Sequence, residues 1–109
     1  MTAAVADSGS QTATIATEHT LTTITAAGVY ALCVDIDNLA AGESVELRVY
    51  GKARTGDTER LVHRGTYGPT KPSTSLVQSV AIISPHYFKA TLKQLTGTGR
   101  AFPWAIYEV

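Results

Sequence analysis

The stretch Gly28-Val-Tyr-Ala-Leu-Cys-Val-Asp-Ile-Asp-Asn-Leu-Ala-Ala-Gly-Glu-Ser-Val-Glu-Leu-Arg-Val-Tyr50 contains two runs in which apolar residues recur at every second position. A period of two is typical of half-buried antiparallel strands. A polar break with the turn residues Asp37-Asn38 and Gly42 separates the runs. The stretch therefore predicts a β-hairpin at the heart of an all-β domain. The residues predicted to share faces are Tyr30, Leu32, Val34 and Ile36 in the first run and Val45, Leu47 and Val49 in the second.

Further strand patterns follow along the chain. Strands are predicted within residues 12–25, 58–67, 76–83, 87–95 and 102–109. Pro103 indicates that the last strand begins there or lies at a sheet edge. Turns about every 8 to 12 residues are typical of a β-sandwich or barrel. With 109 residues, the chain is predicted to form one antiparallel β-sandwich, jelly-roll-like, of seven or eight short strands over residues 12–109.

Residues 1–11 are small and polar. They can bury little apolar surface, so we expect a flexible N-terminal arm ahead of the sandwich. Such an arm either stays disordered or orders on a neighbouring subunit.

The charges balance, with nine basic and nine acidic residues. A neutral chain offers no electrostatic reason to bind nucleic acid or an anionic membrane, and it lacks the self-repulsion that opposes assembly. No run approaches the roughly 20 apolar residues of a transmembrane helix. The first residues have no basic start and no long apolar run, so no secretory signal is expected.

Cys33 is the one cysteine and lies in the middle of a predicted strand. A lone cysteine forms no internal disulfide, and free cysteine packs as a small hydrophobe, so we expect a core or interface residue. The absence of a disulfide framework fits synthesis in a reducing cytoplasm.

The chain shows no set of residues typical of an active site. His19, His63 and His86 are scattered, and a structural zinc site needs close ligand pairs. Asp35 and Asp37 lie two apart and could pair as carboxylates, but capping of the turn is the preferred interpretation. There is no Gly-x-Ser-x-Gly elbow, and the Gly97-Thr-Gly99 turn lacks the helix and lysine of a phosphate loop. No catalytic, cofactor-binding or metal-binding residue is predicted, and the protein is expected not to be an enzyme.

Two groups of residues could form binding surfaces, but each has a plainer interpretation. Lys89, Lys93, Arg100 and Tyr87 could form a basic aromatic face for single strands, but a solvated face is preferred. Trp104 and Tyr107, with Tyr67 elsewhere, could stack on sugars in a carbohydrate- or receptor-binding module. Core packing is preferred for Trp104, because it shares a face with Phe102 and Ile106.

Several runs resemble the small cement, or decoration, proteins of tailed-phage capsids. They are Thr17-Glu-His-Thr-Leu21, Gly28-Val-Tyr-Ala-Leu-Cys-Val-Asp-Ile36, Gly42-Glu-Ser-Val-Glu-Leu-Arg-Val-Tyr50 and Leu92-Lys-Gln-Leu-Thr-Gly-Thr-Gly-Arg-Ala-Phe-Pro-Trp104. The resemblance implies a non-enzymatic β-sandwich, made in the host cytoplasm, that binds the outer capsid surface of the virion. Its implied partners are the major capsid protein and two further copies of itself in a trimer.

The expected contacts with capsid or neighbouring subunits lie in two segments. One is the arm and the residues after it, and the other is the loop that follows the strand at 58–67. The residues chosen are Ala4, Val5, Gln11, Thr12, Thr14, Tyr67, Pro69 and Pro72.

Overall fold

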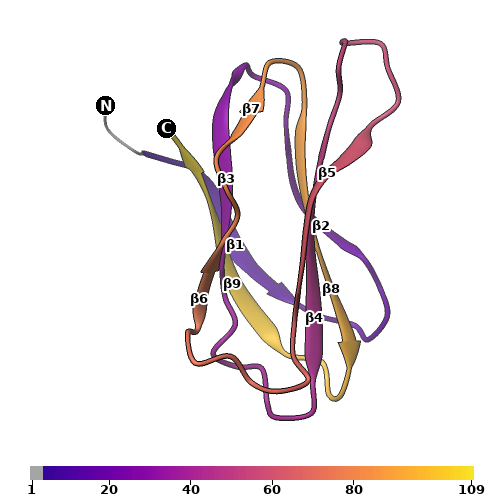
Figure 1. The fold of residues 1–109 in the computed structure, drawn as a ribbon, viewed down its shortest axis with the longest axis vertical. Coiled ribbons are helices and arrows are strands. Elements are labelled where there is room, and N and C mark those ends of the chain that lie inside the picture. Colours follow the sequence, from indigo (N-terminus) through magenta and orange to yellow (C-terminus); the bar gives the residue numbers. More distant parts are fainter. Residues whose placement is uncertain (1–3) are drawn as a thin grey trace.

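Nine β-strands make up the regular structure of residues 4–109, the part of the chain that the computed structural model describes (Figure 1). They are β1 (Ala4–Thr12), β2 (His19–Ile24), β3 (Gly28–Asp35), β4 (Ser44–Gly51), β5 (Arg60–Tyr67), β6 (Leu76–Gln78), β7 (Ile82–Ser84), β8 (Phe88–Thr96) and β9 (Ala101–Glu108). The predicted count of seven or eight strands is too low. The run 76–83 contributes two short strands, and the expected arm contributes one.

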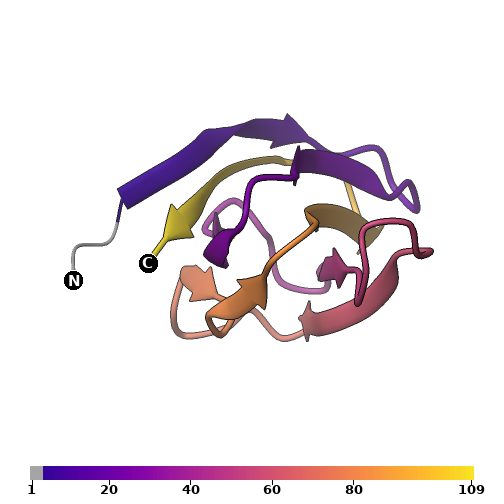
Figure 2. The ribbon, with the colours of Figure 1, turned by 90° about the horizontal axis from the view of Figure 1, so that it is seen from above.

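The strands form two antiparallel sheets packed face to face, so the predicted β-sandwich is confirmed (Figure 2). Sheet A has the order β1-β9-β3-β6, and β7 pairs with the other end of β3. Sheet B has the order β2-β8-β4-β5. The core lies between the sheets, and most of its side chains come from the inward-facing positions of β3, β4, β8 and β9.

The core contains the two predicted apolar faces. Phe88 of sheet B packs against Tyr30 of sheet A with ring centroids 5.4 Å apart. Tilted aromatic pairs at this separation add to the gain from burial. The buried hydrophobic cluster is Ala13, Tyr30, Leu32, Val34, Ile36, Leu39, Val45, Leu47, Val49, Val77, Ile82, Phe88, Ala90, Leu92, Phe102 and Ile106.

The predicted hairpin over residues 28–50 is wrong, because its two strands do not pair with each other. β3 belongs to sheet A and β4 to sheet B, so the chain crosses from one sheet to the other between them. Leu39 is fully buried in this connection, and the Leu39 N–H donates to the Ile36 carbonyl (2.9 Å). Alternation shows that a strand has one buried face, but two strands that face each other across a core carry the same pattern as two that pair.

The prediction of a flexible arm over residues 1–11 is wrong for residues 4–11, which belong to a strand. Residues 4–12 form β1, which pairs with β9 from Ala4↔Glu108 to Thr12↔Ala101 with one irregularity between Val5 and Asp7. Backbone pairing orders this segment, although its side chains are small and exposed. Residues 1–3 lie outside the described part of the chain.

Pro103 is neither at a strand start nor on an edge strand. It is the third residue of β9, which lies between β1 and β3. The pairing of β9 with β3 begins at Trp104↔Val34, so Pro103 lies just beyond that ladder and opposes only Ser10 of β1. The proline therefore interrupts no pairing with β3.

Candidate functional site

One end of the sandwich gathers three connections, and we call it the loop end. It consists of residues 36–43 between β3 and β4, 68–75 between β5 and β6, and 97–100 between β8 and β9, at the bottom of Figure 1. Backbone hydrogen bonds join these loops to one another and to the segment after β1. The Gly42 N–H donates to the Pro69 carbonyl (2.7 Å), and the Ala13 N–H donates to the Arg100 carbonyl (2.8 Å).

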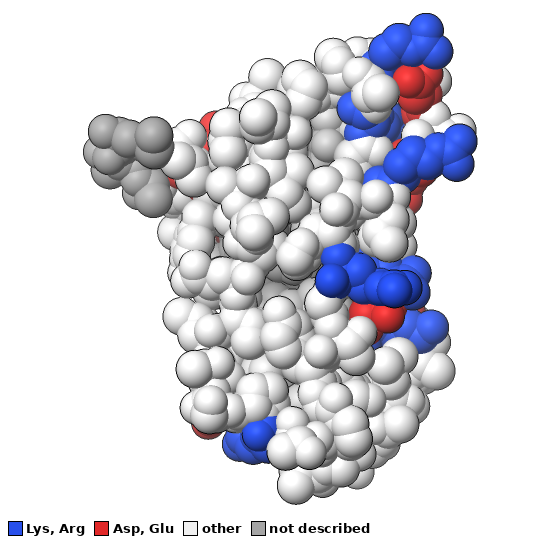
Figure 3. Space-filling view, viewed as in Figure 1, with Lys and Arg blue, Asp and Glu red and all other residues white. Residues whose placement is uncertain are grey.

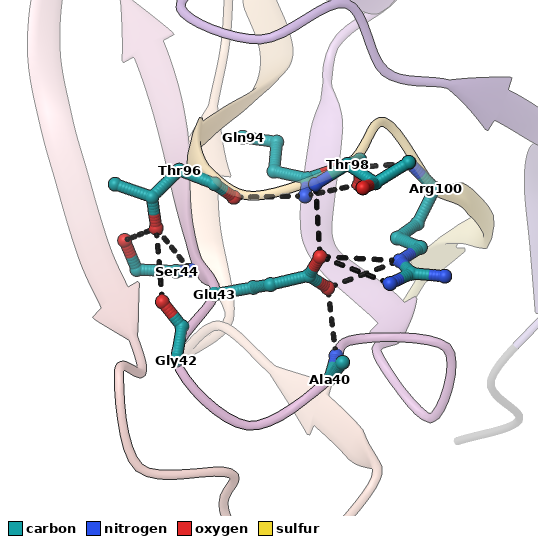
Figure 4. Close-up of polar contacts among 8 residues, drawn as sticks. All are labelled: Ala40, Gly42, Glu43, Ser44, Gln94, Thr96, Thr98 and Arg100. Atoms are coloured by element: carbon teal, nitrogen blue, oxygen red, sulfur yellow. Dashed lines mark hydrogen bonds and ion pairs between the residues drawn. The ribbon is translucent and has the colours of Figure 1, made fainter.

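The carboxylate of Glu43 is buried at the centre of the loop end (Figure 4). It accepts hydrogen bonds from the backbone N–H of Ala40 (2.8 Å) and of Thr98 (2.9 Å). The Arg100 guanidinium binds both carboxylate oxygens, with Nε 3.0 Å from Oε1 and Nη2 3.0 Å from Oε2. A bidentate pair fixes orientation as well as distance. Glu43 thus fastens the β8–β9 turn to the β3–β4 connection.

A second group of polar contacts continues this network into sheet B (Figure 4). The Gln94 side-chain amide donates to the carbonyls of Thr96 (3.0 Å) and Thr98 (2.8 Å), and its oxygen accepts from the Arg100 N–H (3.0 Å). The Thr96 hydroxyl accepts from the Ser44 N–H (3.1 Å). Within residues 4–109 no buried side-chain nitrogen or oxygen lacks a hydrogen-bond partner. The network is therefore complete and holds the loops in one arrangement.

The electrostatics of Glu43 follow from these contacts. The hydrogen bond with Arg100, assisted by those from Ala40 and Thr98, lowers the pKa of Glu43 from 4.5 to about 2. The same ion pair raises the pKa of Arg100. Both groups stay charged at neutral pH, and the carboxylate accepts from several donors at once. A group held in this way is suited to shaping a surface rather than to exchanging protons.

Replacing Glu43 with Gln tests this role. The folded-state pKa is depressed, so the ionised carboxylate contributes stability that is present above pH 4.5 and is lost as the pH falls through about 2. Glu43→Gln is expected to unfold at lower urea concentration than the parent at neutral pH, and this difference should shrink on acidification through that window. Asp57→Asn is the control, because it removes only an exposed ion pair with Arg54 and should change stability little. A difference that stays constant from neutral pH to pH 2 would contradict the assignment.

The surface of the loop end consists mainly of small uncharged residues. The exposed residues include Ala41, Gly42, Pro69, Thr70, Ser73, Thr74, Thr96, Gly97 and Thr98. The exposed charges Asp37 and Lys71 neutralise each other, with Nζ 3.9 Å from Oδ1. The Asp35 carboxylate accepts from the Asp37 N–H (2.9 Å), so turn capping, the preferred interpretation of this acidic pair, is confirmed. Such a surface can lie flat against another without an electrostatic penalty.

The structure places some of the predicted contact residues at the loop end and others away from it. Thr12 and Thr14 flank Ala13, which bonds to the β8–β9 turn, and Pro69 bonds to Gly42. Pro72 belongs to the same 68–75 loop and is half-buried, whereas Tyr67 packs against the core.

Ala4, Val5 and Gln11 lie along β1 instead. Ala4 and Val5 are exposed near the start of the strand, and Gln11 is half-buried near its end. They therefore belong to an edge of sheet A rather than to the loop end.

Most charged side chains gather over sheet B and its upper loops, at the right of Figure 3. Glu18 accepts from the hydroxyls of Tyr50 (2.7 Å) and Thr91 (2.6 Å). Burial opposes ionisation of Glu18, but these hydrogen bonds and the charges of Arg48 and Lys89 leave its pKa below the ordinary value. Glu18 and its neighbours on this face therefore form a hydrogen-bonded network, in which each contact opposes small movements of the other side chains.

The residues considered for a basic aromatic face do not lie together in the fold. Lys89 and Tyr87 both bind Glu59, at 2.6 and 2.7 Å. The Lys89 hydrogen bond, with that from Tyr87, lowers the pKa of Glu59. Arg100 lies at the loop end against Glu43. These cations therefore serve separate ion pairs.

One side of the sandwich is exposed and apolar, which was not predicted from the sequence. Leu76, Val80 and Ile83 are exposed on β6, β7 and the bend between them. Figure 3 shows almost no charge over the area where Figure 1 draws these strands. The weak alternation of residues 76–83 was the available signal, because a run without clear alternation leaves apolar side chains on both faces.

The aromatic residues considered for sugar binding are only partly together. Trp104 and Tyr107 line a shallow hollow of about 240 Å³ on sheet A, beside Asp35 and Leu76. A hydrogen bond with Cys33 raises the pKa of Tyr107, and Cys33 is buried as expected. Trp104 is half-buried and packs against the core, and its ring lies over Gly9 of β1. Tyr67 lies in sheet B and takes no part in the hollow.

Neither a metal cluster nor a membrane-spanning helix is present in the described part of the chain. Among residues 4–109, no group of three or more His, Cys, Asp or Glu side chains could hold a metal ion. No helix in the described part of the chain is long and apolar enough to cross a membrane. Comparison of the chain with protein-family models, with curated proteins and with solved structures found no match.

Proposed function

We propose that the protein is a non-enzymatic structural component of a virion, a cement or decoration protein that binds the outer surface of a tailed-phage capsid. Its partners are then the major capsid protein and further copies of itself, with a trimer favoured. The observation that supports this proposal most directly is the loop end. Three loops whose exposed residues are mainly small and uncharged are held in one arrangement. The Glu43–Arg100 pair joins the 36–43 and 97–100 loops, and the Gly42–Pro69 hydrogen bond adds the 68–75 loop.

The physical reason concerns many weak contacts. A preorganised loop surface loses little conformational entropy when it docks. Each contact with the shell can be weak, because a capsid offers the same site many times and oligomeric binding multiplies the affinity. A satisfied polar network without a free reactive group is what such a surface needs.

The first test is a mass-spectrometric inventory of purified phage particles, in which the chain should be present in many copies. The second is sedimentation of the purified protein with particles that lack it. Thr70→Glu and Thr98→Glu place charges on the loop end and should abolish co-sedimentation. Thr58→Glu, at the opposite end and equally exposed, should bind like the parent. Absence from particles, or equal binding by all three variants, would contradict the proposal.

The alternative function is a carbohydrate- or receptor-binding module of a phage tail or fibre. The hollow that contains Trp104, Tyr107 and Asp35 favours it, because an aromatic ring beside a carboxylate suits a sugar. Trp104 is the one tryptophan, so its fluorescence should change when a glycan binds. A glycan array without signal, together with unchanged fluorescence, would remove this alternative.

A further inference from the structure

Sheet A ends in two unpaired edges, one formed by a single long strand and the other by two short strands. One edge is β1, residues 4–12, which pairs only with β9. The other is the segment that contains β6 and β7, residues 76–84, which pairs only with β3. Each edge therefore presents a row of backbone N–H and C=O groups without a partner strand in the described chain.

Neither edge carries a lysine or a proline, although β1 has an irregularity between Val5 and Asp7 and β6 and β7 are only three residues long each. Natural edge strands are blunted with lysine, proline or inward-pointing charge. Residues 4–12 and 76–84 contain no Lys, Arg or Pro. Asp7 is the one charged residue of the two edges, and its carboxylate already accepts from the Thr22 hydroxyl (2.6 Å) and the Ser8 N–H (2.9 Å). Two such edges can approach each other without a repulsive charge.

The strand directions determine how copies can meet. Each neighbour in the order β1-β9-β3-β6 is antiparallel to the one before it, so β1 and the β6–β7 edge run in opposite directions. Two copies placed side by side in the same orientation therefore bring antiparallel edges together. This is the arrangement around a rotation axis parallel to the strands.

Full overlap of the two edges also matches their exposed side chains. It sets Ala4 opposite Ser84 and Thr12 opposite Leu76, and it brings Val5 opposite Ile83. Val5 is 60 % exposed and Ile83 is 80 % exposed. Both point away from the core, because Val5 opposes Tyr107 on the outer face and Ile83 follows the buried Ile82. Pairing would cover the two side chains with each other.

We infer that copies of this chain associate head to tail, with β1 of one copy pairing antiparallel with the β6–β7 edge of the next, in a closed ring. All loop ends then face the same side of the ring. The inference goes beyond capsid binding and does not depend on it, because it concerns the purified protein alone.

The test is the mass of the purified protein by light scattering after size-exclusion chromatography. The parent should give a multiple of 11.5 kDa, with three copies expected if the proposed trimer is this ring. Val5→Lys and Ile83→Glu should each have the mass of a monomer, and circular dichroism should show that both variants are folded. Leu61→Lys, on the exposed part of β5, is the control and should assemble like the parent.

A charge pair distinguishes head-to-tail pairing from pairing of identical edges. Val5 and Ile83 lie on opposite edges of one molecule, so they can meet only between copies. A mixture of Val5→Lys and Ile83→Glu should assemble with the two variants alternating in equal numbers, because every contact between unlike copies is either the introduced charge pair or the parental Val5–Ile83 contact. A chain that carries both changes should assemble again. A monomeric parent, a dimer of Ile83→Glu alone, or a double variant that stays monomeric while folded would each overturn the inference.

Discussion

Leu47→Asp is expected to unfold the domain. Leu47 lies in β4 between β8 and β5, and its side chain is only 5 % exposed. The substitution removes a core side chain and places a carboxylate within the hydrophobic core cluster. Burial of an unpaired charge costs at least several kcal/mol, which is comparable with the roughly 5 to 15 kcal/mol that stabilises a typical domain.

Circular dichroism and thermal melting measure this effect. Leu61→Asp is the matched control, because it is the same change at a leucine that is 46 % exposed on β5, and it should melt close to the parent. If Leu47→Asp melted like the parent, the buried face of β4 would be assigned wrongly.

Gly68→Ala is expected to destabilise the protein much more than Gly42→Ala. Both glycines have positive φ, +103° and +86°, a conformation that costs an alanine about 1 to 2 kcal/mol. At Gly42 an added Cβ meets no atom within 4 Å. At Gly68 it would collide with the Glu43 carbonyl oxygen and lie 2.9 Å from the Ser44 Cα. Backbone atoms cannot give way as a flexible side chain can, so the loop would have to move.

Urea unfolding of the two variants separates strain from collision. Gly42→Ala should lose about 1 to 2 kcal/mol of unfolding free energy. Gly68→Ala should lose at least several kcal/mol or fail to fold, since it adds a steric clash to the same strain. Equal losses would mean that the 68–75 loop does not lie against the start of β4.

The ring and the loop end fit one geometry. An axis parallel to the strands leaves the sides of the sandwich to neighbouring copies and directs every loop end to the same side. The proposed capsid contact and the inferred contact between copies therefore use different surfaces. Charges placed at Thr70 or Thr98 and charges placed at Val5 or Ile83 should have separable effects.

The sequence alone determined the buried faces of β3 and β4. Val45, Leu47 and Val49 are buried in β4 as predicted, and so are Tyr30, Leu32 and Val34 in β3. Alternation with a period of two is a local property, which a single strand displays whatever its partners are. The β-sandwich class follows from the same patterns.

Only the tertiary structure decided which strands pair and what the loops do. β3 and β4 lie in different sheets. The sequence could not show this, because two strands that face each other across a core and two strands that pair within a sheet have the same pattern. Residues 4–12 form a strand because β9 offers a backbone partner far along the chain. The loop end depends on Glu43 meeting Arg100, 57 residues away. These contacts join distant segments, and their partners cannot be read from local composition or periodicity.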